Sequence, residues 1–196
     1  DFIEHLFIGS THDSILFFTD DGRVYWLKVH EIPQAGRAAR GKPVVNLINV
    51  TPDTRIRAMM PIREFREDYS LLFCTRNGTV KKTSLAQYSN PRSTGIKAIK
   101  IEEGDELIDV QVTTGTNDIV LATRHGMSLR FHESDVREMG RDTTGVRGID
   151  LRARDQVVGM VVVKREATLL VVTEKGLGKC SHIDDYRVQK RGGKGI

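Results

Sequence analysis

The chain has 196 residues, of which 30 are Lys or Arg and 26 are Asp or Glu, and its formal net charge is +4. This length suits a core that folds without disulfides, and two cysteines exclude a disulfide framework or a cysteine-based metal cluster. The apolar stretches are too short to span a bilayer and no signal-peptide pattern opens the chain, so we expect a cytoplasmic protein without membrane contact. The mildly basic charge permits an anionic partner without proving one.

The first predicted element is a β-hairpin around Gly22, in which apolar residues 15–18 precede the turn and residues 24–27 follow it. Glycine supplies the positive φ that such a turn requires. The pattern recurs three times along the chain, at intervals of 56, 48 and 50 residues between the turn glycines. These glycines are Gly22, Gly78, Gly126 and Gly176.

A second glycine follows each turn glycine by 17 to 19 residues, and an arginine precedes it by three or four. The glycines are Gly41, Gly95, Gly145 and Gly195, and the arginines are Arg37, Arg92, Arg141 and Arg191. We expect strands after this landmark, over residues 44–48, 96–101 and 146–151, and then, after an acidic turn, over 105–108 and 155–158. Helical patterns are limited to single turns within 84–88 and 133–139.

A period near 50 residues with about four strands per unit predicts an all-β, propeller-like fold. We place the repeat units at about 1–56, 57–108, 109–158 and 159–196, within a single domain over 1–196. Four or fewer such units rarely close a ring. We therefore expect the chain to be part of a longer domain, or a domain whose remaining blades are disordered or were removed.

The residues give no support to an enzymatic function. The six histidines lack metal-ligand spacing, the turn at 176–179 lacks the spacing of a phosphate loop, and no nucleophile elbow is present. We interpret the acidic cluster at 102–106 as an inter-strand turn. The sequence therefore predicts no catalytic residue, no metal site and no cofactor in this chain.

The sharpest local feature is Gln189–Gly195, in which three cations and three glycines share seven residues. Glycine lets backbone N–H groups approach a phosphate, and Arg can bind it through two parallel N–H bonds. From charge alone, a solvated basic loop is an equally good interpretation. The corresponding loops of the other units are also basic, which favours a rim that follows a phosphate backbone. The scarcity of aromatic residues favours duplex backbone over stacked single-strand bases.

The candidate nucleic-acid-binding residues fall into two groups. Those in the C-terminal loop are Gln189, Lys190, Arg191, Gly192, Gly193, Lys194 and Gly195. Those in the other loops and just after the turn glycines are Arg37, Arg40, Lys42, Lys81, Lys82, Arg92, Lys97, Arg130, Arg141, Arg147 and Lys179. Because the repeat places the loops equivalently, we expect them at corresponding points around one rim.

Three segments resemble the C-terminal domain of the DNA gyrase A subunit. Gln189–Gly195 is similar to that family's signature box, residues 1–33 resemble the stretch that follows the box, and residues 140–149 resemble a later blade. In the family the box belongs to the first blade, so we interpret Gln189–Gly195 as a repeat copy of it in a later blade.

The resemblance implies a β-pinwheel, whose neighbouring blades exchange strands, and a non-catalytic domain that binds and bends double-stranded DNA on a basic outer rim. It also implies partnership with the rest of the gyrase A subunit and with the gyrase B subunit. That holoenzyme is an ATP-dependent type IIA topoisomerase that introduces negative supercoils, and its catalytic tyrosine and ATPase lie elsewhere. Two alternatives stay open: the equivalent domain of the topoisomerase IV A subunit, which handles DNA crossings, and, less favoured, a protein-binding propeller.

Overall fold

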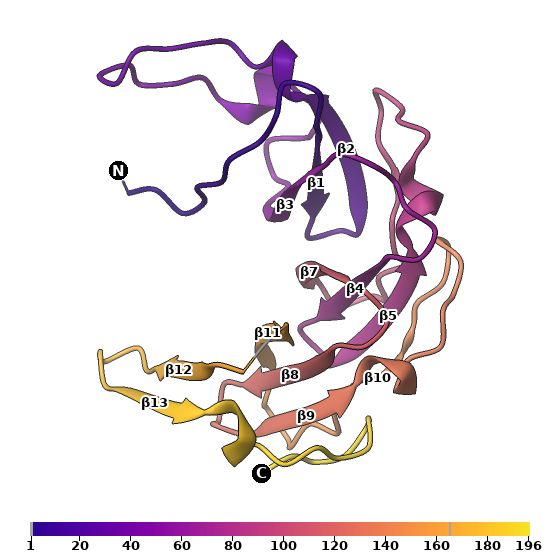
Figure 1. Cartoon of the computed structure of the whole chain (residues 1–196), viewed down its shortest axis with the longest axis vertical. Helices are drawn as coiled ribbons and strands as arrows, with labels where there is room; N and C mark the ends of the chain where they lie inside the picture. Colours follow the sequence, from indigo (N-terminus) through magenta and orange to yellow (C-terminus); the bar gives the residue numbers. More distant parts are fainter. Residues whose placement is uncertain (1, 165) are drawn as a thin grey trace.

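The computed structural model describes residues 2–164 and 166–196. Within these ranges the chain forms four antiparallel sheets that follow one another around an open arc (Figure 1). We call the sheets blades 1 to 4 in chain order. Their strand orders are β3-β1-β2-β6, β10-β5-β4-β7, β11-β8-β9 and β12-β13.

The elements are short throughout. The strands are β1 (Ser14–Thr19), β2 (Arg23–Lys28), β3 (Ile56–Ile62), β4 (Ser70–Thr75), β5 (Thr79–Ser84), β6 (Ile96–Lys97), β7 (Leu107–Thr113), β8 (Asp118–Thr123), β9 (Ser128–His132), β10 (Val146–Arg147), β11 (Val157–Val163), β12 (Thr168–Val172) and β13 (Gly178–His182). The 3₁₀ turns are η1 (Val29–Glu31), η2 (Val44–Asn46), η3 (Leu85–Tyr88), η4 (Glu133–Asp135) and η5 (Ile183–Asp185).

Each blade is built around the predicted hairpin. β1 pairs with β2, β4 with β5, β8 with β9 and β12 with β13, all antiparallel. The four turn glycines have φ between +81° and +87°, the left-handed region in which glycine is favoured. The four predicted hairpins are therefore confirmed.

Neighbouring blades exchange strands. β6 follows the hairpin of blade 2 in sequence but pairs with β2 of blade 1, and β10 likewise returns from blade 3 to pair with β5. In blade 3, the N–H of Ile196 and the N–H of Ser128 each donate to the other residue's carbonyl oxygen, both at 2.8 Å. The all-β, strand-exchanging pinwheel implied by the resemblance is confirmed.

The second glycine landmark marks the point where the exchanged segment crosses the preceding blade. A Cβ on Gly95 would lie 2.7 Å from the ring of Tyr25, and a Cβ on Gly145 or Gly195 would overlap the backbone of Val80 or Ser128. All three glycines have positive φ. Each of these glycines therefore marks, in the sequence, the place where an exchanged segment crosses the preceding blade.

The strands predicted after this landmark are shorter than expected. Only Ile96–Lys97 and Val146–Arg147 are strands, because the chain then turns inward. The N–H groups of Ala98 and Ile99 donate to the carbonyl oxygen of Gly22, and Ile99 is buried. By contrast, β7 and β11 begin within the predicted segments and run to residues 113 and 163.

The strand predicted over 44–48 is wrong. Residues 44–46 form the 3₁₀ turn η2, and Val44, Leu47 and Ile48 pack against Ile15 and Phe17 on blade 1 itself. Among the described residues, Gly41 has nothing within 4 Å of the position where its Cβ would stand. The apolar residues of this segment thus cover the sheet of their own blade.

Two larger apolar cores lie between neighbouring blades. Phe18 of blade 1 meets Phe73 and Tyr88 of blade 2 edge-on, with ring centroids 5.6 and 6.3 Å apart, an arrangement favoured by aromatic quadrupoles. A second core joins blades 2 and 3 around Phe131 and Ile149. Stacking of blades thus buries the faces that a single blade cannot cover.

Candidate nucleic-acid interface

Three of the predicted basic loops touch one another in series. Nη1 of Arg141 donates to the carbonyl oxygen of Lys97 at 3.4 Å, and at the equivalent place one unit later Nη1 of Arg191 donates to that of Arg147. A backbone contact repeats beside each of these side-chain contacts. The N–H of Lys100 donates to the Thr143 carbonyl at 3.0 Å, and that of Asp150 to the Gly193 carbonyl at 2.8 Å.

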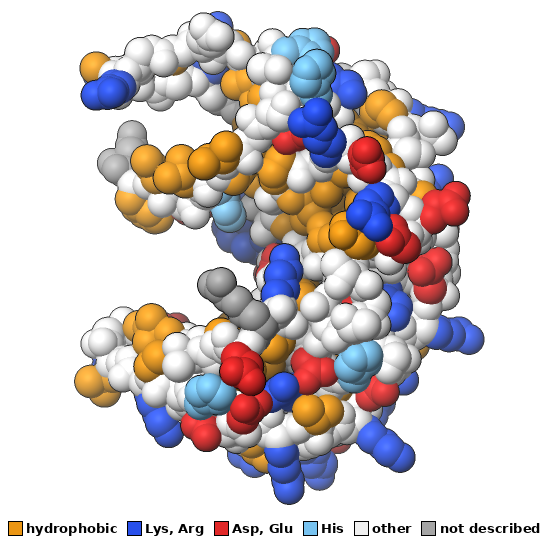
Figure 2. Space-filling view, viewed as in Figure 1, with side chains coloured by type: hydrophobic (Ala, Val, Ile, Leu, Met, Phe, Trp, Pro, Cys, Tyr) orange, Lys and Arg blue, Asp and Glu red, His pale blue; other side chains and the backbone are white. Residues whose placement is uncertain are grey.

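We call these three loops, residues 92–97, 141–147 and 189–195, the rim band. They lie on the outer, convex side of the arc (Figure 1). The exposed cations of the band are Arg92, Lys97, Arg147, Lys190 and Lys194, whereas Arg141 and Arg191 are half-buried. Figure 2 shows Lys and Arg side chains projecting from this outer edge, with acidic side chains between them on one stretch.

The C-terminal loop is held mainly through its backbone. The N–H of Gln189 donates to the Arg130 carbonyl at 2.7 Å, and that of Gly192 to the Gly148 carbonyl at 2.8 Å. Arg191 also donates from Nε to the Asp135 carbonyl at 2.9 Å. Lys190 and Lys194 remain exposed. The box-like segment therefore has a fixed backbone from which two lysines project.

The first loop does not join the band. Arg37, Arg40 and Lys42 are exposed, but their loop projects from blade 1 at one end of the arc without crossing another blade (Figure 1). The equivalence predicted from the repeat is therefore not seen at this loop, which is followed by the 3₁₀ turn η2 and not by an exchanged strand. The first unit contacts the rim band further along the chain, where Nδ2 of Asn49 donates to the Ser93 carbonyl oxygen at 3.1 Å.

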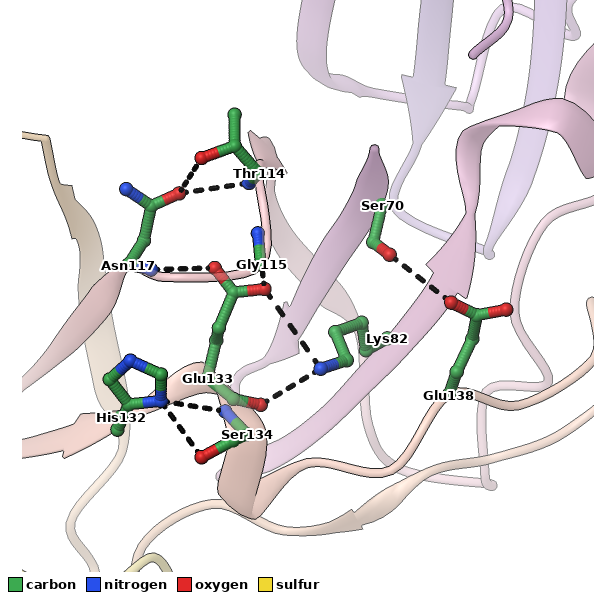
Figure 3. A network of polar contacts seen from close by, with 9 residues as sticks. All are labelled: Ser70, Lys82, Thr114, Gly115, Asn117, His132, Glu133, Ser134 and Glu138. Atoms are coloured by element: carbon green, nitrogen blue, oxygen red, sulfur yellow. Dashed lines mark hydrogen bonds and ion pairs between the residues drawn. The ribbon is translucent and has the colours of Figure 1, made fainter. Parts of the chain in front are cut away.

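The residues predicted to add charge just after the turn glycines include three that face neighbouring blades instead. Nζ of Lys82 donates to the backbone carbonyl of Glu133 at 3.0 Å (Figure 3), and Nη1 of Arg130 donates to that of Ile183 at 2.8 Å. Each of these side chains is 13% exposed. Lys82 and Arg130 are therefore better described as links between blades than as phosphate ligands.

These links form a repeated structural device that the sequence pattern did not reveal. Trp26, Lys82 and Arg130 each stand four residues after a turn glycine, and each donates to a carbonyl in or beside the 3₁₀ turn of the next blade. The Trp26 Nε1–H reaches the Tyr88 carbonyl at 2.9 Å. Because the three side chains differ chemically, only the shared position in the repeat marks them. The same position of blade 4 holds the exposed thiol of Cys180.

Figure 3 shows how the Lys82 link is completed. The buried carboxylate of Glu133 accepts the backbone N–H groups of Gly115 at 3.1 Å and Asn117 at 2.8 Å, and lies 3.9 Å from Nζ of Lys82. The Asn117 side chain in turn accepts the N–H of Thr114 at 2.9 Å. A buried carboxylate requires such partners, because an unpaired buried charge is strongly destabilising.

Lys81, the third of these residues, is fully buried and cannot contact DNA where it stands. Its Nζ donates to the carbonyl oxygens of Ala98 at 2.6 Å and Arg141 at 2.7 Å, and lies 5.0 Å from the centre of the Phe73 ring. Burial lowers the pKa of Lys81 to about 7, although the charge of Asp142 opposes that shift. Lys81 is therefore a structural support beneath the Arg141 loop. Lys179, by contrast, is exposed on β13, outside the rim band.

Arg23 is a basic residue of this surface that lies outside the set predicted from the sequence. It directly follows the turn glycine of blade 1, and its Nη2 donates to the carbonyls of Thr94 at 2.9 Å and Gly95 at 3.0 Å. Arg23 could have been found from its position in the repeat, because the hairpin turn that it follows lies next to Gly95, the crossing glycine of the following unit.

The part of the chain that the structure describes offers no metal centre. No group of three or more His, Cys, Asp or Glu residues gathers there in a way that could hold a metal ion. Within the same residues, none of the helices is long and apolar enough to cross a membrane.

The observations define a class: an all-β, propeller-like protein whose blades exchange strands and whose outer loops are basic. A family model described as the DNA gyrase C-terminal domain, beta-propeller, matches residues 13–63, 69–114, 117–164 and 167–196. The chain therefore belongs to the DNA gyrase A C-terminal domain family, and the resemblance stated from the sequence is confirmed.

Curated relatives agree with this assignment. The DNA gyrase A subunit of Salmonella typhimurium is 44% identical over 196 residues, which are 100% of this chain and 22% of the relative. The corresponding protein from Clostridium acetobutylicum is 48% identical over 196 residues, which are 100% of this chain and 24% of the relative. The chain thus spans less than a quarter of the length of these relatives.

Solved structures share the fold. The C-terminal domain of a DNA topoisomerase IV superimposes with a TM-score of 0.87 and 31% identity, over 95% of this chain and 58% of that one. A DNA gyrase A C-terminal domain superimposes with a TM-score of 0.80 and 24% identity, over 95% of this chain and 60% of that one.

Proposed function

We propose that this chain binds duplex DNA along the rim band and bends it around the outside of the arc, without a cofactor and without catalysis of its own. The observation that carries the proposal is the continuity of the band. Equivalent loops of successive units touch through the same two contacts, and exposed cations project from them. Because phosphates recur regularly along DNA, a series of equivalent cationic loops suits its backbone independently of sequence.

The curvature of the arc supports bending. Smoothly bending 20–30 bp of DNA by 40–90° costs on the order of 1–6 kcal/mol. Several phosphate contacts spread over three loops can offset that cost, whereas contacts confined to one loop would leave the DNA straight. The family supplies the context: the chain would act with the rest of the gyrase A subunit and with the B subunit in a cytoplasmic, ATP-dependent topoisomerase. There it would present bent DNA for strand passage towards negative supercoils.

The test is binding of the 196-residue chain to a duplex of about 40 bp, labelled at both ends and titrated at several salt concentrations. If about five cations neutralise phosphates, the logarithm of the affinity falls with the logarithm of the salt concentration with a slope of roughly −4.5. Energy transfer between the labels rises as the ends approach. The variant Lys175→Ala, which lies outside the rim band, serves as the control and keeps the same slope. Absence of binding at low salt would contradict the proposal.

A second candidate function rests on one comparison. The likeness to the C-terminal domain of a DNA topoisomerase IV, at a TM-score of 0.87, favours the alternative stated from the sequence, a domain that handles DNA crossings rather than wrapping DNA. The same experiment separates the two: binding with a similar salt slope but no approach of the duplex ends would favour this second function.

A further inference from the structure

A polar hollow of about 430 Å³ lies at the seam between blades 1 and 2, where β2 meets the loop that leads into β6. We call it the seam hollow. Its charged lining residues are Arg23, Arg92, Lys97, Arg141 and Asp142. Four cations thus face one carboxylate. Among residues 2–164 and 166–196, none of the four lies within ion-pair distance of an acidic side chain.

Two of the guanidinium groups are positioned before any ligand arrives. Nη2 of Arg23 is held by the carbonyls of Thr94 and Gly95, and Nη1 of Arg141 by the carbonyl of Lys97. A guanidinium has five N–H donors, so both groups keep donors for an anion after making these contacts. Lys81 holds the Arg141 carbonyl from beneath at 2.7 Å. Pre-positioned donors reduce the entropy lost on binding.

The equivalent seam between blades 2 and 3 is different. The repeat replaces Arg23 with Thr79 and Arg92 with Asp142, while Lys97 and Arg141 correspond to Arg147 and Arg191. The positions of the neutral Gln87 and Asn90, which also line the seam hollow, become Asp135 and Glu138. The hollow that lies at this seam, where β5 meets β10, is lined by one cation, Arg147, and two carboxylates, Glu102 and Asp150. The excess of positive charge is therefore a property of the first seam and not of the repeat.

We propose that the seam hollow anchors a phosphate of the DNA backbone and holds it more tightly than any equivalent position at the next seam. This inference rests on the proposed function and deepens it: DNA contact along the rim band is unequal, strongest between blades 1 and 2. A phosphodiester carries one negative charge and accepts paired N–H bonds from Arg, which matches the lining. Free inorganic phosphate shares this chemistry and is separated from DNA in the test.

The repeat offers a matched pair of variants for the test. The variant R92A/K97A removes two exposed cations from the seam hollow, and R147A/K190A removes two exposed cations from elsewhere in the rim band. Both lower the charge equally, and none of the four side chains is buried. DNA affinity at one fixed salt concentration is measured for the unchanged chain and both variants. We expect roughly a hundredfold loss for R92A/K97A, in keeping with two charged hydrogen-bonding partners, and about tenfold or less for R147A/K190A.

A titration with inorganic phosphate alone, followed by NMR of backbone amides, identifies the hollow without DNA. We expect the largest shifts at Thr94–Lys97 and their loss in R92A/K97A. Equal affinity losses in the two variants would overturn the inference and leave the proposed function standing. Failure of the unchanged chain to bind DNA would overturn both, even if inorganic phosphate bound in the hollow. Phosphate shifts spread evenly over all three loops would also overturn the inference.

Discussion

Gly145 crosses Val80 so closely that a Cβ on Gly145 would overlap the Val80 carbonyl oxygen. Its φ of +108° lies in the region that favours glycine. Gly145→Ala therefore combines backbone strain with a clash against backbone that cannot move aside. We expect a loss of about 3 kcal/mol in the free energy of unfolding, measured by urea titration. Gly41→Ala, at a φ of +73° in open space, isolates the strain and costs about 1 kcal/mol. Equal losses would show that the crossing contributes nothing.

The Arg130 link predicts a local loss of stability. Arg130→Met removes the donors to the Ile183 carbonyl at 2.8 Å and the Tyr186 carbonyl at 3.2 Å, and leaves Asp118 without its partner at 2.9 Å. Breaking a largely buried pair costs roughly 3–5 kcal/mol. Hydrogen exchange of the amides in β12 and β13 accelerates, because blade 4 is attached to blade 3 through these contacts. The exposed Arg124 supplies the control: Arg124→Met leaves the exchange rates unchanged.

Lys81 predicts a pH dependence of stability. Its pKa is lowered to about 7 in the folded chain, whereas an unfolded lysine titrates near about 10.4. Between these values the unfolded state binds more protons, so the free energy of unfolding rises with pH across this window, by at most ~5 kcal/mol. The stabilising effect is lost as pH falls towards 7. Chemical unfolding of the chain and of Lys81→Met between about pH 6.5 and about 9.5 checks this, and an unaltered slope in the variant would refute it.

Substitutions in the C-terminal loop distinguish effects on DNA affinity from effects on the stability of the fold. Lys190→Ala with Lys194→Ala removes two exposed charges and no contact that holds the fold, so the magnitude of the salt slope falls by roughly 2 while the melting temperature is unchanged. Arg191→Ala lowers both, because Arg191 also holds the carbonyls of Asp135 and Arg147. Salt-dependent DNA binding and thermal unfolding of the same samples provide the two readouts. An unchanged melting temperature for Arg191→Ala would mean that its contacts carry no stability.

The repeat made much of the fold predictable. The hairpins follow from apolar runs around glycines with positive φ, which are local properties of the chain. The second glycine landmark is visible in the sequence for the same reason. The structural requirement for a glycine at that position is not visible there. A glycine such as Gly95 is required because Tyr25, 70 residues earlier in the sequence, passes beneath it, and no local pattern reports such a contact.

The candidate site was predictable only in part. Lys81 and Lys190 are the same residue type in basic stretches, yet one is buried against the Ala98 and Arg141 carbonyls and the other is exposed. The direction in which a side chain points depends on the blade that packs beside it. The seam hollow also required the fold, because Arg23 and Arg141 meet there from different units.

The sequence by itself determined the repeat, the all-β class and the family, since these depend on residue type and spacing along the chain. Only the tertiary structure decided which cations face solvent, which link the blades, and where positive charge is left unpaired. The physical reason is that strand exchange brings loops from successive units into contact. The charge of each seam is then a sum over residues far apart in sequence, and equivalent positions such as Arg23 and Thr79 give neighbouring seams different character.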